Sequence, residues 1–207
     1  MRRISESTVR RLAAYLRFLE QAETEGRGTI SSGELAKLGG TTSAQVRKDL
    51  SFFGSFGKRG LGYSVPALAA KIGEILGLQR AHRVVLVGAG KMGGALAQYR
   101  GFHQRGFHIS AIFDTDPRKV GLRWNGLLVR DIKQLEADLH KDPIDIAIVT
   151  TPAEAAQDVV DKLVSAGVKA ILNFAPVRLS VPPDVEVKTV NMALELETLS
   201  YALANRG

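Results

Sequence analysis

Gly88-Ala89-Gly90-Lys91-Met92-Gly93 is the stretch that decides the fold of the larger part of this chain. It follows the apolar run Val84–Val87, which is typical of a buried strand, and it leads into a segment with helix-forming residues. Asp114 closes the next strand-like run, 107–113, and lies 21 positions after Gly93. A strand, a GxGxxG turn, a helix and a later acidic residue together form the layout of a dinucleotide-binding βαβ unit.

Each residue of this motif has a predicted role in binding a nucleotide. Gly88 and Gly90 permit a tight turn and a close approach of the backbone to a pyrophosphate, and Gly93 lets the helix pack on the strand. A carboxylate at Asp114 accepts hydrogen bonds from ribose hydroxyls and repels a 2′-phosphate, which favours NAD(H) over NADP(H). Lys119 follows closely and would soften that preference. The alternative for Asp114 is a turn residue at the end of a strand.

Strand-like and helical runs alternate through the rest of the chain, which predicts a doubly wound parallel sheet of the α/β class. The expected strands are 84–87, 107–113, 127–129, 145–150, 169–173 and 185–190, and the expected helices are 92–104, 132–140, 153–166 and 192–204. Ligands bind such sheets at the carboxyl ends of the strands. Thr150, Thr151, Pro152 and Asn173 occupy those ends, where they either bind a nicotinamide or ribose or cap the turns that follow.

Nothing in the sequence indicates catalysis. About 125 residues follow position 82, and the sheet uses them all, so no substrate domain is left. The four histidines fall in a predicted linker, a helix, a strand and a helix end, and none has a carboxylate partner at a strand end. The chain has no cysteine, and no metal-ligand spacing appears. We therefore expect a nucleotide sensor with no catalytic residue and no metal.

The charge of the chain is uneven. The net charge is +7, and residues 1–80 carry 13 Lys and Arg against seven Asp and Glu, so most of the excess lies there. Such asymmetry predicts an anionic partner for this third of the chain, with nucleic acid the leading candidate. No apolar run is long enough to span a bilayer and no signal-peptide core follows the first residues, so we expect a cytoplasmic protein.

The N-terminal third has the pattern of a helix-turn-helix. A helix over 6–21 is followed by two capped helices, one beginning with a Ser31/Glu34 capping box and one with a Thr42/Gln45 box that runs to about residue 53. The second capped helix is polar and basic outside, as a recognition helix is. Its predicted DNA contacts are Ser43, Gln45 (to adenine), Arg47 (to guanine) and Lys48 (to phosphate).

Glycines flank a Lys-Arg pair in the next segment, 54–63, as in the hairpin wing of a winged helix. A slim basic tip of this kind, here Lys58, Arg59 and Gly60, suits the narrow minor groove of A·T-rich DNA. The alternative is that these are ordinary solvated loop charges. A helix from Pro66 completes the small domain. We expect a winged helix at 1–78, a Rossmann-like NAD(H)-binding domain at 79–190 and a terminal helix at 191–207.

Four stretches together resemble the Rex family of redox-sensing transcriptional repressors, and the likeness covers nearly the whole chain. They are Val46-Arg47-Lys48-Asp49-Leu50-Ser51-Phe52-Phe53-Gly54, Lys58-Arg59-Gly60-Leu61-Gly62-Tyr63, Thr151-Pro152-Ala153-Glu154-Ala155-Ala156-Gln157 and Gly167-Val168-Lys169-Ala170-Ile171-Leu172-Asn173-Phe174-Ala175-Pro176. The resemblance implies a homodimer that binds a palindromic operator, releases it when NADH binds and keeps it with NAD⁺. It also implies that the last helix swaps to the other subunit.

The resemblance assigns further residues and exposes departures from the family pattern. It implies that Tyr99 and Arg17 belong to the ligand-responsive switch, with Tyr99 among the residues that bind the cofactor. Members of the family often carry an Asp-hydrophobic pair where this chain has Asn191-Met192, so a charged pair with Arg17 becomes a neutral hydrogen bond, which is typically about half as strong. Lys91 replaces a commoner neutral residue and would add a charge contact to the pyrophosphate.

The residues leave two other functions open. One is a constitutive A·T-rich DNA-binding protein whose pocket is structural or holds another ligand, such as coenzyme A. The other is a small oxidoreductase with a basic appendage, which would need an acid or base beside the nicotinamide.

Overall fold

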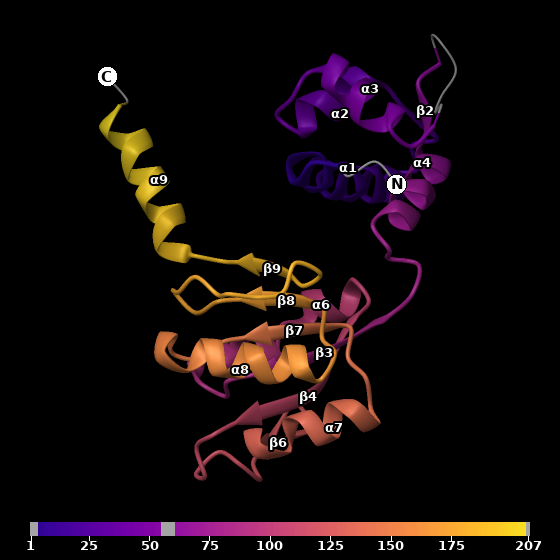
Figure 1. Ribbon diagram of the computed structural model, residues 1–207. Coiled ribbons are helices and arrows are strands. Elements are labelled where there is room, and N and C mark those ends of the chain that lie inside the picture. Colours follow the sequence, from indigo (N-terminus) through magenta and orange to yellow (C-terminus); the bar gives the residue numbers. More distant parts are fainter. Residues whose placement is uncertain (1–3, 55–60, 206–207) are drawn as a thin grey trace. The chain divides into compact units, whose positions relative to one another are not determined.

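The structure, a computed structural model, describes residues 4–54 and 61–205 of the 207-residue chain. The chain divides into two compact units, 1–80 and 81–207 (Figure 1). The terminal helix belongs to the second unit. Every helix among the described residues is too short or too polar to cross a lipid bilayer.

The first unit is a small helical domain closed by a two-stranded sheet. Its elements are α1 (Glu6–Thr24), β1 (Thr29–Ile30), α2 (Ser32–Leu38), α3 (Ser43–Ser51), β2 (Tyr63–Ser64) and α4 (Val65–Ile75). β1 and β2 pair antiparallel, with Ile30 opposite Tyr63. The inner faces of the four helices bury one core, which includes Leu12, Leu35, Val46 and Ile72. The predicted helix-turn-helix is therefore present, accompanied by the β1–β2 pair.

The two predicted capping boxes have different outcomes. At α2, the Ser31 hydroxyl accepts from the backbone N–H of Glu34, whose side chain accepts in return from the N–H of Ser31, so this box is confirmed. At α3, Thr42 accepts from the N–H of Gln45, but the Gln45 side chain bonds to Asp49 instead of returning to the cap. The second box was therefore half wrong, because a buried carboxylate competes for the same amide. α3 also ends at Ser51, two residues earlier than predicted.

The second unit is a seven-stranded sheet in the order β5-β6-β4-β3-β7-β8-β9. Its elements are β3 (His82–Val87), α5 (Lys91–Ala97), α6 (Arg100–Gln104), β4 (Phe107–Asp114), β5 (Arg123–Trp124), β6 (Leu127–Asp131), η1 (Ile132–Gln134), α7 (Leu135–Lys141), β7 (Ile146–Val149), α8 (Ala153–Ser165), β8 (Ala170–Asn173), β9 (Glu186–Thr189) and α9 (Met192–Ala204). All neighbouring strands are parallel except the β5–β6 pair. The six parallel strands have the order of a Rossmann fold.

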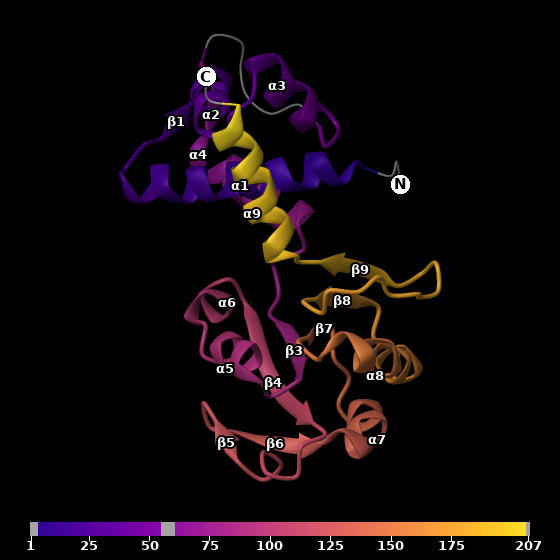
Figure 2. The same cartoon turned by 90° about the vertical axis from the view of Figure 1, so that its left-hand side faces the viewer.

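Helices cover both faces of this sheet, which Figure 2 shows nearly edge-on, with α5 and α6 on one side and α7 and α8 on the other. The alternating residues of the central strand explain this arrangement. Val84 and Leu86 point into the core beneath α5 and α6, whereas Val85 and Val87 point into the core beneath α7 and α8. The predicted doubly wound architecture is confirmed.

Two local features differ from the sequence-based expectation. The predicted helix 92–104 is two helices, because the backbone at Tyr99 is extended, with φ −74° and ψ 103°. β5 was not predicted, although Asn125-Gly126 is a strong hairpin signal. Both residues have positive φ, 50° and 82°, and form the tight turn between β5 and β6.

α9 differs from the other helices because every one of its residues is exposed. Leu194, Leu196, Leu199 and Leu203 are between 51% and 68% exposed, and Tyr201 is 72% exposed. An apolar helix that covers nothing within its own unit is expected to be covered by another surface.

Candidate functional site

The glycine loop connects β3 to α5 and forms one wall of a cavity. Gly88 has φ +107°, and a Cβ there would lie 2.8 Å from the carbonyl of Thr150. A Cβ at Gly93 would lie 1.9 Å from the Gly88 oxygen, so α5 can pass over the loop only with glycine. Gly90 is different, because no atom of the described residues, its two chain neighbours aside, lies within 4 Å of the place where its Cβ would be. The open space at Gly90 is where a phosphate could approach the backbone.

Asp114 lies at the end of β4, directly beside this loop, and is 8% exposed. Its Oδ2 accepts from the backbone N–H of Ala89 at 2.5 Å, and its Oδ1 accepts from that of Asp116 at 2.7 Å. The Lys119 ammonium lies 3.3 Å from Oδ2. A carboxylate offers about four acceptor positions, so one remains on Oδ1 for a ribose hydroxyl. Asp114 is thus both a turn residue and a candidate ligand, so the two interpretations left open are compatible.

The cavity has a volume of about 490 Å³, within the range of small-molecule sites. It lies at the carboxyl ends of the strands, as expected for this fold. Its lining residues are Val87, Gly88, Gly90, Met92, Asp114, Thr115, Asp116, Lys119, Ile132, Thr150, Thr151, Pro152, Ala155, Val159 and Phe174.

Two threonines in this lining have distinct roles. The Thr150 hydroxyl donates to the carbonyl of Gly88 at 2.8 Å and so holds the glycine loop against β7. The Thr151 hydroxyl is buried and has no hydrogen-bond partner among the described residues. A buried hydroxyl without a partner is costly, which makes Thr151 a candidate ligand for a bound polar group.

Four predicted cofactor residues do not line this cavity. Gly93 is one of them, and it lies where α5 passes over the glycine loop. Asn173 is fully buried, and its amide bonds to Ala175 and Val177 within the turn after β8, so the geometry supports its structural alternative. Tyr99 is 59% exposed and lines a separate cavity beside α6. Lys91 is exposed at the first position of α5, next to the lining residues Gly90 and Met92.

Sequence reasoning missed several lining residues. Phe174 follows β8 at a strand end that had been singled out for its neighbour Asn173. Asp116 lies two residues after Asp114 in the same turn, and a hydrogen bond from Arg118 lowers the pKa of Asp116 to about 2. Ile132 and Val159 are apolar residues whose type does not indicate ligand binding in the sequence. Only the tertiary fold brings them to the cavity.

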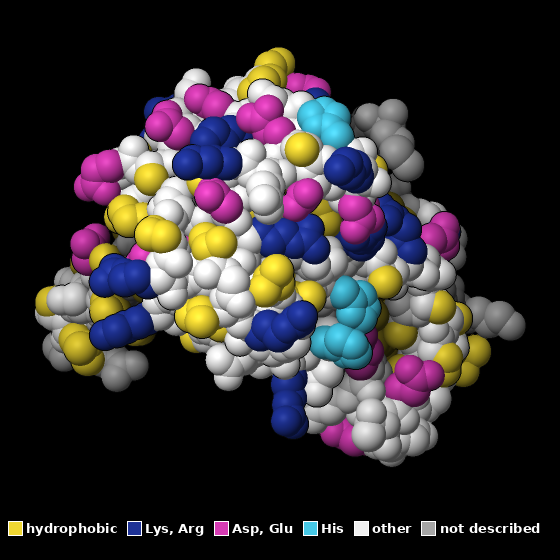
Figure 3. Space-filling view, turned by 90° about the horizontal axis from the view of Figure 1, so that it is seen from below, with side chains coloured by type: hydrophobic (Ala, Val, Ile, Leu, Met, Phe, Trp, Pro, Cys, Tyr) yellow, Lys and Arg dark blue, Asp and Glu magenta, His cyan; other side chains and the backbone are white. Residues whose placement is uncertain are grey.

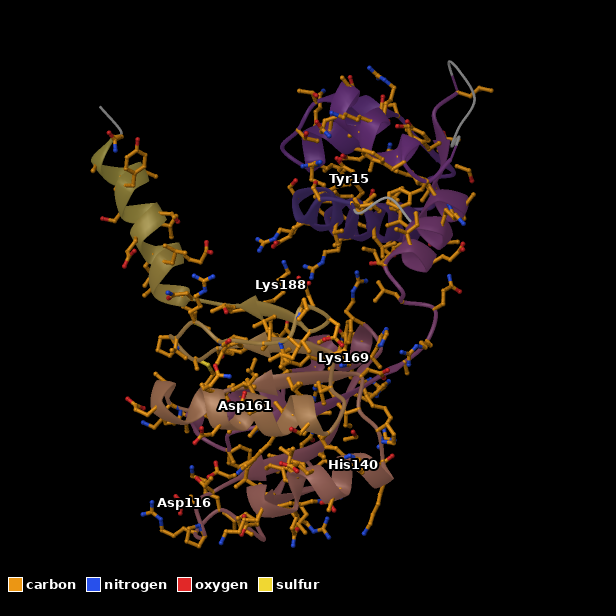
Figure 4. All side chains as sticks on the ribbon, viewed as in Figure 1. Tyr15, Asp116, His140, Asp161, Lys169 and Lys188 are labelled. Atoms are coloured by element: carbon orange, nitrogen blue, oxygen red, sulfur yellow. The ribbon has the colours of Figure 1, made fainter. Side chains whose placement is uncertain are left out.

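Among the described residues, the lining of the cavity contains no acid and base placed as a catalytic pair. Asp114, Asp116 and Lys119 are its only titratable lining residues among those described, and they are bound to one another. His140 is remote from this cavity, because it lies at the opposite end of the sheet from the lining residue Asp116 (Figure 4). His82 is the first residue of β3, where a linker was expected, and it stacks on Phe107. The described residues also include no cluster of His, Asp and Glu suited to a metal ion.

The candidate DNA-binding surface is the outer face of α3. Arg47 and Lys48 are exposed on this face, and Ser43 and Gln45 are half-buried. The Arg47 guanidinium donates to the Ser32 hydroxyl of α2 at 3.0 Å, so α2 and α3 share one outer surface. Lys58, Arg59 and Gly60 of the predicted wing lie outside the described residues.

The face shown in Figure 3 mixes Lys and Arg with Asp and Glu side chains. The nearly balanced charge of residues 81–207, 15 basic against 14 acidic, agrees with a mixed surface on the second unit.

A buried carboxylate holds α3 on α1. Asp49 of α3 is fully buried and accepts from Arg11 Nε at 2.6 Å, Arg11 Nη2 at 2.7 Å and the Tyr15 hydroxyl at 3.1 Å. Gln45 Nε2 donates to the same carboxylate at 2.8 Å. Burial opposes the charge on Asp49, but the hydrogen bonds from Arg11, Gln45 and Tyr15 outweigh it and lower the pKa of Asp49. No sequence pattern indicates this group, because Arg11 and Asp49 are far apart in the chain.

Besides Tyr99, the resemblance connects three residues with the switch, and all three are exposed within their own units. Arg17 lies on α1, and Asn191 and Met192 begin α9. The Asn191 side chain accepts from the backbone N–H groups of Ala193 and Leu194, so Asn191 is the N-cap of α9. Their role in a switch stays a prediction.

Two family models match the chain, one over each unit. The model described as "CoA binding domain" matches residues 79–177, and the one described as "Putative DNA-binding protein N-terminus" matches residues 3–51.

Relatives match over nearly the full length. The "Redox-sensing transcriptional repressor Rex" of Desulfitobacterium hafniense (strain DSM 10664 / DCB-2) is 48% identical, over 99% of this chain and 97% of its own. Among solved structures, RSP in complex with β-NAD⁺ and operator DNA has a TM-score of 0.93 and 40% identity, with 98% of this chain and 94% of RSP covered. RSP in complex with β-NADH has a TM-score of 0.88 and 39% identity, with 97% and 94% covered.

Proposed function

The chain belongs to the Rex family of redox-sensing transcriptional repressors, and we propose that it represses transcription by binding operator DNA and releases that DNA when NADH binds. The observation that carries the proposal is the pairing of two sites in one chain. The second unit has a nucleotide-sized cavity lined by Gly90 and Asp114, and the first presents a capped basic helix.

The residues of the cavity suit a dinucleotide. We propose that the backbone at Gly90 and the start of α5 receive the pyrophosphate, with Lys91 adding a positive charge. Asp114 would bind a ribose hydroxyl of the adenosine through its remaining acceptor position, and Thr151 would bond to a polar group of the ligand. Bound NAD(H) would supply only its oxidation state, because the titratable residues of the described lining are bound to one another and not placed to move a proton. The protein would thus act as a sensor and not as an enzyme.

Switching requires that the two cofactor forms stabilise different states of the protein. We propose a homodimer in which the exposed apolar residues of α9 pack on the second copy, since α9 covers nothing in its own unit. The two recognition helices would then meet successive major grooves of a palindromic operator, about 34–36 Å apart. The dimer would have two states that differ in the spacing of the recognition helices. Only a difference in NADH affinity between these two states can release the DNA. Such a regulator would act in the cytoplasm.

One observation favours a second candidate, a DNA-binding protein that responds to coenzyme A. The family model that matches residues 79–177 is described as a CoA binding domain. Coenzyme A carries a phosphate on its adenosine ribose, and the carboxylates of Asp114 and Asp116 at this end of the cavity would repel it. The electrostatics of the cavity therefore favour NADH.

The test is a fluorescence anisotropy titration of the full chain on an A·T-rich inverted repeat, at one salt concentration because phosphate contacts make affinity salt-dependent. NADH, NAD⁺ and coenzyme A are added separately. We expect release by NADH and retention with NAD⁺. Gly90→Val is the matched control, because its side chain enters open space at the cavity and should abolish the NADH response while DNA binding persists. Operator binding that is equally strong with saturating NADH would overturn the proposal.

A further inference from the structure

The hydrogen bonds around Asp49 would affect how α3 reads DNA bases. Three residues of α1 (Thr8, Arg11 and Tyr15) and one of α3 (Gln45) donate to this one carboxylate. Asp49 and Gln45 are four residues apart, so both lie on one side of α3. Tyr15 lies within the helical unit (Figure 4), and its burial raises the pKa of its hydroxyl to about 12, so it remains a donor.

The charge on Asp49 decides which way the Gln45 amide faces. An ionised carboxylate can only accept hydrogen bonds, and the lowered pKa of Asp49 keeps it ionised at neutral pH. The amide must therefore turn its nitrogen, not its oxygen, toward Asp49. The Nε2–Oδ1 distance of 2.8 Å agrees with that orientation. Among the described residues, nothing donates to Gln45 Oε1, so this oxygen is an available acceptor on a half-buried side chain.

The bonds from α1 make this orientation rigid. Arg11 contacts both carboxylate oxygens in a bidentate pair, and Tyr15 fixes one of them again. Asp49 is fully buried, so solvent does not compete for its oxygens. Rotating the Gln45 amide by 180° would place two acceptors against each other, which is unfavourable at a buried site.

We propose that Asp49 is a positioning residue that presents Gln45 to the major groove with its oxygen outward, as an acceptor for an exocyclic amino group. In the major groove, adenine N6 and cytosine N4 carry such a group, whereas guanine O6 and thymine O4 are acceptors and would be rejected. The second Nε2 hydrogen could also reach adenine N7, which would favour adenine over cytosine. This inference rests on the proposed function, because it assumes that α3 enters the groove.

The experiment measures base preference, not affinity alone. An operator is first selected from random duplexes with the wild-type chain, and each half-site position is then substituted in turn. At the position read by Gln45, we expect the wild type to prefer an amino-bearing base by roughly tenfold. Replacing adenine there by purine, which lacks the N6 amino group, or cytosine by pyrimidin-2-one, which lacks N4, should remove that preference. The analogue 7-deazaadenine tests the N7 contact.

Two variants separate positioning from stability. Asp49→Asn offers both a donor and an acceptor, so it should reduce the preference at that one position to less than about threefold. In this variant, the base preferences at other positions and the salt dependence of DNA affinity should remain. A purely structural Asp49 would instead weaken every duplex equally and leave the base profile intact, which would overturn the proposal.

Gln45→Met decides the question if Asp49→Asn does not fold, because it keeps the shape of the side chain and leaves the Arg11–Asp49 pair in place. It should lose the same preference, and an unchanged profile would also overturn the proposal. Gln21→Met is the matched control, since Gln21 bonds to Glu25 near the end of α1 and not to Asp49. Failure of the proposed function is recognised separately, because the wild type would then bind no operator or keep it with NADH.

Discussion

Each unit of this protein contains one buried aspartate beside its candidate binding surface, and the two are used differently. Asp49 is fully enclosed, and its hydrogen bonds come from side chains of α1 and α3. Asp114 is 8% exposed, accepts mainly from backbone N–H groups and keeps an acceptor position toward a cavity. The first carboxylate therefore orients another residue that would meet the ligand, whereas the second would meet the ligand itself.

The comparison predicts that losing Asp49 costs more stability than losing Asp114. Asp49→Ala leaves the Arg11 charge, with 26% side-chain exposure, and the amide of Gln45 without their partner. Removing one member of a buried pair costs about 3–5 kcal/mol, and the partial exposure of Arg11 places this case near the lower value. Urea unfolding followed by circular dichroism measures the loss.

Asp142→Ala is the control for this prediction, because Asp142 also pairs with an arginine, Arg83, but is exposed at the surface. We expect a much smaller loss of stability there, because solvent screens an exposed ion pair. The comparison between the units fails if Asp114→Ala destabilises the chain as much as Asp49→Ala does.

The pH dependence of unfolding gives a second measurement of how much Asp49 stabilises the chain. The pKa of Asp49 is lowered by folding, so its contribution to stability is complete above the ordinary carboxyl pKa of about 4 and is lost as the pH falls toward the lower folded value. The Asp49→Ala chain should lack that part of the acid dependence. An identical slope below pH 4 in both chains would contradict the assignment.

The two carboxylates also explain what the sequence could and could not predict. Asp114 was identified because a βαβ unit places its strand, glycines and acid at regular spacings along the chain. Asp49 was not, because its partners on α1 lie 34 to 41 residues away and no local pattern links them. The same contact altered the Thr42/Gln45 box, since tertiary bonding removed the side chain that the local motif needed. The Ser31/Glu34 box was confirmed because no distant group takes its carboxylate away from the cap.

Two substitutions in the glycine loop should separate a glycine needed for packing from a glycine needed for binding. Gly93→Ala places a methyl group 1.9 Å from the Gly88 oxygen, so the loop must shift. Overpacking of this kind costs about 1–3 kcal/mol, and we expect the melting temperature and NADH affinity to fall together. Gly90→Ala enters open space with an ordinary φ of −86°, so it should weaken NADH without lowering the melting temperature. Calorimetric titration and thermal unfolding measure both; equal melting temperatures for the two variants would show that the loop is not packed as described.

The smallest expected effect concerns Asn191, which caps α9 and is predicted to take part in the switch. Its side chain accepts from Ala193 and Leu194, so Asn191→Ala should cost about 1 kcal/mol of helix stability, seen as faster amide exchange in the first turn of α9. Asn191→Asp preserves the cap and adds a negative charge at the positive end of the helix, so α9 should be at least as stable.

The two substitutions therefore distinguish capping from switching at this position. If the residue also pairs with Arg17, the aspartate should increase the ratio of operator affinities measured without and with NADH, because a charged hydrogen bond is roughly twice as strong as a neutral one. An unchanged ratio in Asn191→Asp would mean that Asn191 acts only as the cap. The switch of this chain would then depend on other contacts of α9, whose apolar residues are exposed in the single chain and available to a second copy.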